Sequence, residues 1–406
     1  FQAPPRTFLV LERTAKVPGP DPGGIGFTVD EMTAIGDKVL RELGLITGFS
    51  RLVLLLGHGS TSQNNPHMSA YNCGACGGAP GGPNARALAQ MLNDPRIRKA
   101  LAGRGIAIPE STVLVGGLHN TSDDSISYHD LDRVPASHRD EFQGARADLA
   151  RACDRDAHER SRRFRSTPLN LSFTAAKLEV EARSEDMAQA RPEWGHMTNA
   201  ICVVGRREIT RGLFLDRRAF LTSYDMTLDE PGLPVLNRIL SAVIPVCAGI
   251  NLEYYFSAVD NAGYGCGTKL PHNIVSLLGV MDGASSDLRT GLPWQMIEFH
   301  EPVRLLFVIE VVPEALQELI DRNEAIRLLC RNEWVRLATI HPETREVRLF
   351  EGGVFQKFER TSRRLPRASS SVDWYRGWRD HLEFAEIGGN GGNGASAVTV
   401  EEGRRS

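Results

Sequence analysis

Histidine and cysteine residues that could bind a metal are concentrated in one short stretch of the chain. The segment LVLLLGHGSTSQNNPHMSAYNCGACGG, residues 52–78, starts as an apolar run and then carries His58, His67, Cys73 and Cys76. Imidazole nitrogen and cysteine thiolate are the natural ligand pair for zinc. Only an ordered loop could bring His58 and Cys73 together. These two are the convincing ligands, whereas a catalytic zinc ion needs about three protein ligands and a structural one about four.

Other kinds of chemistry stay open for the same loop. The glycines of GACGGAPGGPN could form an anion-binding nest, but the stretch matches neither GxxxxGK[ST] nor GxGxxG. GHGST places Ser60 beside His58, yet the hydrolase elbow is GxSxG. An apolar strand followed by GHGS also resembles the chelatases, in which a histidine at a strand end handles a metal-bearing tetrapyrrole.

The neighbouring sequence predicts the elements that position this loop. RLVLLLG is an apolar run of strand length, and STVLVGGLH is a second one. The intervening ARALAQMLNDPRIRKAL is helical, with Asn84 as its cap and a kink or restart at Pro95. Strand, helix and strand at this spacing predict a βαβ unit with parallel, neighbouring strands.

Loops at the carboxyl ends of parallel strands share one edge of the sheet. The loop HNTSDDSISYHD, residues 119–130, would therefore lie beside the loop that begins at His58. His119, Asp123 and Asp124 could then approach His58. The alternative is an ordinary polar turn, because Asn, Asp and Ser are common turn residues.

The rest of the chain indicates a mixed α/β organisation. Thr28 and Glu31 have capping-box spacing before the helix DEMTAIGDKVLREL. An Arg-rich helix over 137–165 has either a solvated surface or a docking face for a partner. The remaining expected elements are strands at ICVVGRREI, LEYYFSAVD, HNIVSLLGVMDG and RLLFVIEVV, the helix PEALQELIDRNEAIRLLC and the hairpin VRLATIHPETREVRLF.

These elements predict an α/β fold with a parallel or mixed sheet flanked by helices. Four regions are expected: a linker over 1–27, an α/β region over 28–165, a mixed α/β region over 166–360, and a tail over 361–406 that is disordered at its end. His272 and His300 are expected to be structural histidines, and Arg206 and Arg207 to form surface ion pairs. The glycines around Cys266 suggest close backbone packing.

Composition narrows the function classes. With 406 residues, 41% hydrophobic and 24% charged, the chain is globular. A net charge of −3 and the lack of a basic–aromatic stripe argue against nucleic-acid binding. Seven scattered cysteines favour a reducing compartment. No signal peptide is evident, and the best candidate for a membrane span, ILSAVIPVCAGI, is shorter than the required ~20 residues and contains Pro245.

Long motifs in consistent order resemble one protein family. LLLGHGSTSQNNPHMSAYNCGACGG, RPEWG, LDRRAFLTSYD, INLEYYFSAVDNAGYGCGTKLPHNIVSLLGVMDG, DLRTGLPWQMIEFHEPVRL and RNEWVRLATIHPET are similar to segments of the DabA family, the large peripheral subunit of the DabAB inorganic-carbon uptake system. The resemblance extends over residues 1 to about 360.

The resemblance implies a zinc site like that of β-carbonic anhydrases, with Cys, Asp, His and Cys as ligands and a related α/β core. His58 and Cys73 match the His and the second Cys, whereas Cys76 is not carried over as a ligand. The first Cys and the Asp belong to a Cys-x-Asp-x-Arg motif that this chain lacks. Together with the start at Phe1, this suggests the carboxyl-terminal half of a DabA protein, with the amino-terminal half completing the site.

The resemblance also implies a function and partners. Hydration of CO2 to bicarbonate would be coupled to ion flow through a DabB-like membrane subunit, with the protein peripheral on the cytoplasmic face of the inner membrane. Whether this chain is an enzyme depends on the ligands it lacks. The alternatives are a non-catalytic α/β scaffold that docks a membrane partner, and a chelatase-like enzyme. The roles of His67, Cys76 and His119 are left open.

Overall fold

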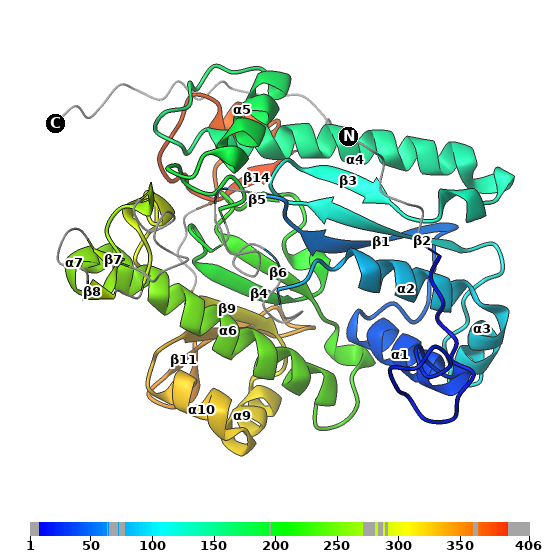
Figure 1. Cartoon of the computed structure of the whole chain (residues 1–406). Helices are drawn as coiled ribbons and strands as arrows, with labels where there is room; N and C mark the ends of the chain where they lie inside the picture. Colours follow the sequence, from blue (N-terminus) through cyan, green and yellow to red (C-terminus); the bar gives the residue numbers. More distant parts are fainter. Residues whose placement is uncertain are drawn as a thin grey trace.

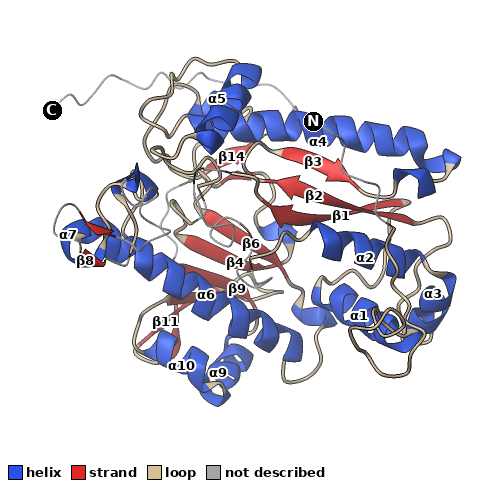
Figure 2. Ribbon diagram, viewed as in Figure 1, coloured by secondary structure: helices blue, strands red, loops and turns tan. Residues whose placement is uncertain are grey.

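Two of the four β-sheets in the described part of the chain frame the protein, whose structure is a computed structural model (Figure 1). The other two sheets contain only short strands of two or three residues. The structure describes residues 8–62, 64, 72, 78–194, 196–270, 281–282, 287–288, 291–359 and 364–388. Helices cover both of the framing sheets (Figure 2). The prediction of an α/β fold with mixed sheets flanked by helices is therefore confirmed.

The first sheet has three strands in the order β1-β2-β3. β1 (Leu52–Gly59) and β2 (Val113–Asn120) pair in parallel over their whole length, and β3 (Ser125–Tyr128) is antiparallel to β2. The predicted βαβ unit is thus confirmed. Its helical part is two helices, α2 (Gly82–Asn93) and α3 (Pro95–Ala102), which restart at Pro95 as expected.

One detail of this unit differs from the prediction. Gly81, not Asn84, is the N-cap residue of α2, so the helix begins earlier. The chain enters the helix by passing directly over the end of β1. A Cβ atom on Gly57 would lie 2.2 Å from the carbonyl carbon of Gly81, so this crossing requires glycine in the strand.

Helices pack on both faces of the first sheet. α1 (Val29–Glu42), which has the predicted capping box of Thr28 and Glu31, joins α2 and α3 on one face. The long helix α4 (Arg139–Ser161) covers the opposite face (Figure 1). Their apolar side chains form separate clusters, one around Leu92 and Leu101 and the other around Val115 and Phe142.

The second sheet has six strands in the order β12-β11-β10-β9-β4-β6. The four strands from β10 to β6 are parallel, and β11 and β12 are antiparallel additions. Three predictions are confirmed here: the strands at ICVVGRREI and RLLFVIEVV, and the hairpin VRLATIHPETREVRLF, which forms β10 and β11. The bounds are β4 Ile201–Gly205, β6 Ala219–Ser223, β9 Leu306–Glu310, β10 Arg336–Ile340, β11 Val347–Glu351 and β12 Val354–Lys357.

The prediction of a strand at LEYYFSAVD was wrong, because this stretch ends the 26-residue helix α6 (Pro234–Val259). Its buried positions recur every three to four residues from Leu236 to Tyr254, which is the period of a helix. Pro245 lies inside the helix without ending it. By length and composition α6 could cross a membrane. The expectation that no segment is long enough for a membrane span was therefore also wrong. Of the most apolar stretch of α6, 33% is buried.

The predicted helix at PEALQELIDRNEAIRLLC is two helices, α9 (Pro313–Arg322) and α10 (Glu324–Arg331). Asn323 separates them because its side chain caps α10. Only Met281 and Asp282 of the predicted strand HNIVSLLGVMDG are described, and the end of the tail lies outside the described residues. The remaining elements are α5 Phe173–Glu185, β5 Leu213–Phe214, α7 Asn261–Tyr264, β7 Met281–Asp282, β8 Asp287–Leu288, β13 Arg367–Ala368, α11 Ser371–Tyr375 and β14 Ala385–Ile387.

Candidate functional site

His58 and His119 lie side by side at the carboxyl ends of β1 and β2, where they are register partners. Register partners in a parallel pair project from the same face of a sheet. Leu54 and Val115, which share the parity of His58 and His119 along their strands, pack in the cluster of Phe142 from α4. Both histidines therefore belong to the face that α4 covers. The predicted approach of the two loops is confirmed.

The loop that follows β1 starts at His58, and its other end, at Gly81, comes back to the same residue. The backbone N–H of Gly81 donates to the carbonyl oxygen of His58 at 2.6 Å, which closes the loop at its base. His67, Cys73 and Cys76 lie outside the described residues, so the proposed ligand Cys73 stays a prediction. His58 itself is exposed at the mouth of this loop.

His119 is held by a buried carboxylate. Its Nε2 lies 3.1 Å from Oδ1 of Asp124, whose side chain is 2% exposed. Hydrogen bonds to Asp124 and then to the Cys153 thiol raise the pKa of His119 to about 9. Asp123 instead accepts from the N–H of Ser125, as an ordinary turn residue does. Asp124 therefore contacts a histidine at the edge of the sheet, whereas Asp123 is the ordinary turn residue that the alternative predicted.

Arg160 of α4 joins the end of β2 to a distant segment. Its guanidinium is 2% exposed and forms an ion pair with Asp124. Nη1 donates to the carbonyl oxygens of Thr121 at 3.2 Å and Pro192 at 2.8 Å. The prediction of a solvated helix surface is therefore wrong for this end of α4. The buried side chain of Arg160 links the loop after β2 to the segment at Pro192.

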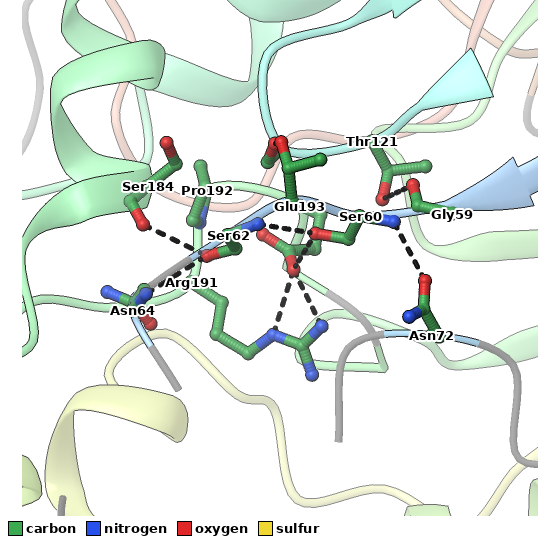
Figure 3. A network of polar contacts seen from close by, with 12 residues as sticks. Gly59, Ser60, Ser62, Asn64, Asn72, Thr121, Ser184, Arg191, Pro192 and Glu193 are labelled. Carbon is green, nitrogen blue, oxygen red and sulfur yellow. Dashed lines mark hydrogen bonds and ion pairs between the residues drawn. The ribbon is translucent and has the colours of Figure 1, made fainter. Parts of the chain in front are cut away.

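The segment anchored at Pro192 carries a buried ion pair. Nε and Nη2 of Arg191 donate to Oε1 of Glu193 at 3.1 and 2.6 Å. Ser60 Oγ, two residues beyond His58, donates to the same oxygen at 3.4 Å (Figure 3). The Glu193 side chain is 6% exposed. Sequence analysis assigned no role to this pair; the only signal was that RPEWG belongs to the family-like motifs.

The beginning of the loop is docked onto the last turn of α5. Ser62 Oγ and the N–H of Asn64 both donate to the carbonyl oxygen of Ser184, at 3.1 and 2.9 Å (Figure 3). The Lys269 ammonium donates to Asn64 Oδ1 and, at 2.9 Å, to the carbonyl oxygen of Gln189. Lys269 is 1% exposed, and burial lowers its pKa to about 7. These contacts fix the direction in which the chain leaves His58.

The donor set at this edge only partly fits a zinc ion. The exposed imidazole of His58 is a suitable ligand. Within the described ranges, however, no three His, Cys, Asp or Glu side chains are grouped so that they could hold a metal. A site with three or more such ligands would therefore include residues beyond the described ones.

Most other residues singled out in the sequence have structural roles. Nδ1 of His300 donates to the carbonyl oxygen of Met197 at 2.8 Å, and Arg206 forms an ion pair with Glu310 at 2.7 Å. His272 lies outside the described residues. All five cysteines in the described part of the chain are buried, which agrees with packing roles; they are Cys153, Cys202, Cys247, Cys266 and Cys330.

The fold and this edge define an α/β protein with a polar site at the carboxyl ends of two parallel strands. A family model described as DabA, probable inorganic carbon transporter subunit DabA, matches residues 1–335. The chain belongs to the DabA family. No solved structure matches it.

Curated relatives carry the same description. A probable inorganic carbon transporter subunit DabA 2 of Rhodopirellula baltica is 52% identical over 384 residues, which cover 95% of this chain and 36% of the relative. A protein of the same description from Sorangium cellulosum is 54% identical over 355 residues, covering 87% of this chain and 35% of the relative. The chain thus spans about a third of the length of these relatives.

Proposed function

We propose that this chain is part of a zinc-binding peripheral subunit that takes up inorganic carbon, with carbonic-anhydrase-like hydration of CO2. The observation that carries the proposal is the position of His58, exposed at the carboxyl end of β1 and paired with His119. Membership of the DabA family supports it. On this proposal the sheet of β1, β2 and β3 belongs to a β-carbonic-anhydrase-like core.

His58 and Cys73 would hold the zinc, together with a Cys and an Asp from a Cys-x-Asp-x-Arg motif elsewhere in the complete protein. Bound zinc lowers the pKa of a coordinated water molecule toward ~7 and so supplies hydroxide near neutral pH. The chain's own residues position this edge. The Gly81–His58 hydrogen bond closes the base of the loop, and Ser62 and Asn64 hold its first part against the carbonyl oxygen of Ser184.

The proposed partner is a DabB-like membrane subunit, through which ion flow would drive bicarbonate accumulation. The relatives are described as transporter subunits, and a subunit implies a partner. The proposed location is the cytoplasmic face of the inner membrane. Helix α6 is long and apolar enough to cross a membrane by length and composition, which is consistent with association at a membrane.

Zinc content tests the proposal. We expect the complete protein to contain about one zinc ion per chain, and His58→Ala and Cys73→Ala to lose most of it, as loss of one ligand of four should cause. His300→Ala is the matched control, because His300 is a half-buried histidine bonded to a backbone carbonyl. Retention of stoichiometric zinc by both ligand variants would refute the site.

A further inference from the structure

Helix α6 is apolar on both of its faces, but the described part of the chain covers only one of them. Leu240, Ile244 and Cys247 pack in the main apolar cluster of the second sheet, across which α6 runs (Figure 1). Two-thirds of the most apolar stretch of the helix is not buried, since the buried share is 33%. A helix that is apolar all round is normally enclosed in a protein core or in a membrane. The other face is therefore expected to be covered in the assembled protein.

This open face of α6 is formed by apolar and small residues. Val246 is 55% and Phe256 37% exposed, and Ala242 and Gly249 are exposed as well. These positions are three, four or seven residues apart, which is the spacing of one helix face. The ring of Phe256 contacts that of the exposed Tyr264, with centroids 5.6 Å apart. The apolar surface therefore continues past the end of the helix.

Glu253 is the single charged residue in the stretch from 242 to 256, and it lies on the open face. No charge or hydrogen bond from the described residues changes its pKa, which partial burial alone raises. Covering an unpaired carboxylate is costly, whereas a cation placed against it offsets that cost. A partner that covers the open face should therefore bring a lysine or an arginine to Glu253.

An apolar helix suits the open face better than a lipid bilayer does. Helices that lie on membranes carry Lys and Arg beside their apolar side chains, but residues 242–256 contain neither. Gly249 has no atom of the described chain within 4 Å of its Cβ position, although glycine destabilises a helix interior relative to alanine. Small residues on a helix surface allow the backbone of a second helix to approach closely.

We infer that the open face of α6 docks an apolar helix of the membrane subunit, and that a lysine or arginine of that helix pairs with Glu253. The inference deepens the proposed function, on which the choice of a membrane subunit as partner rests. It assigns α6 as the element that joins this chain to the membrane part of the complex.

Photo-crosslinking of the complete protein in its membrane complex tests the inference. Benzoylphenylalanine in place of Val246 should cross-link to an apolar helix of the membrane subunit, identified by mass spectrometry of the product. The same probe in place of Leu178, a 61% exposed position of α5, is the matched control and should give no such product. A cross-link from position 246 to lipid or to another part of the same polypeptide, or no cross-link at all, would overturn the inference.

Two substitutions test the contacts of the open face. Gly249→Leu blocks the close approach and Glu253→Lys reverses the charge, so the amount of copurified membrane subunit should fall roughly tenfold or more in each. The matched controls are Gly144→Leu, at a glycine inside α4 with no atom within 4 Å of its Cβ position, and Glu318→Lys, on the exposed side of α9. Both controls should retain the wild-type amount.

The outcomes separate this inference from the proposed function. Unchanged copurification in both α6 variants would overturn the docking surface alone. Circular dichroism reports folding, and if one variant does not fold, the other variant and the cross-link decide. Zinc is measured in the same samples: a wild type that carries the membrane subunit without zinc contradicts the zinc site alone, whereas one that carries no membrane subunit contradicts the proposed partner and the docking surface together.

Discussion

Arg160 donates a hydrogen bond to the carbonyl oxygen of Pro192 at 2.8 Å, from a helix on one side of the sheet to a loop 32 residues further along the chain. The same guanidinium pairs with Asp124, which in turn holds His119. One buried side chain therefore fixes both the end of β2 and the segment that carries Glu193. The geometry of the candidate site depends on this link.

Replacing Arg160 should destabilise the protein strongly. Arg160→Met leaves the buried Asp124 with His119 as its remaining partner and frees two backbone carbonyl oxygens, so the free energy of unfolding should fall by about 3–5 kcal/mol. Urea unfolding followed by circular dichroism measures the change. Arg151→Met is the control: that side chain is 67% exposed on the same helix, and its loss should cost less than about 1 kcal/mol. Equal losses would contradict the structural role of Arg160.

Substitution by alanine should change the stability of the protein in opposite directions at two glycines. A Cβ atom on Gly116 of β2 would lie 2.7 Å from the Cα atom of Arg86, so Gly116→Ala should push α2 off the sheet and cost about 1–3 kcal/mol. Gly144 lies inside α4 with no atom within 4 Å of its Cβ position. Gly144→Ala should therefore stabilise the protein by roughly 0.5–1 kcal/mol. Thermal unfolding of both variants checks the signs; a stabilised Gly116→Ala would disprove the packing of α2.

The buried Lys269 should make stability depend on pH. Burial lowers its pKa to about 7, below its value in the unfolded chain, so the unfolded state binds more protons between pH 7 and about 10. Stability from this group therefore rises with pH through that window, and the full penalty is present below it. In Lys269→Met the rise should disappear.

The measurement for Lys269 is the urea midpoint at pH 7, 8.5 and 9.5 for wild type and variant. Lys99→Met, at an exposed position of α3, serves as the control and should retain the wild-type pH dependence. Parallel curves for wild type and Lys269→Met would show that the amine is not buried as the structure describes.

The first sheet could be predicted from sequence because its signals are local. The apolar runs of β1 and β2 are separated by one helical stretch, and the handedness and spacing of such units leave only a parallel pairing. That pairing alone placed His58 beside His119. The cap of α2 could not be predicted, since it depends on the crossing of Gly81 over Gly57, a contact between loop and strand.

Helix α6 shows where local patterns fail. The stretch LEYYFSAVD is rich in aromatic residues, which favour strands, but burial of Tyr254 in the cluster of Phe164 and Trp194 selects the helical period. The Ser60–Glu193 contact could not be predicted for a different reason: 133 residues separate the two, and only the packing of α4 and the segment after α5 brings them together. The family-like motif RPEWG was the single hint.

X-ray absorption spectroscopy of the zinc-loaded complete protein shows directly whether His58 is a zinc ligand. We expect one imidazole nitrogen at about 2.0–2.1 Å and two sulfur ligands at about 2.3 Å. In His58→Ala, with His300→Ala as control, any zinc that remains should lose the imidazole signal. A His58→Ala spectrum identical to that of wild type would contradict zinc ligation by His58.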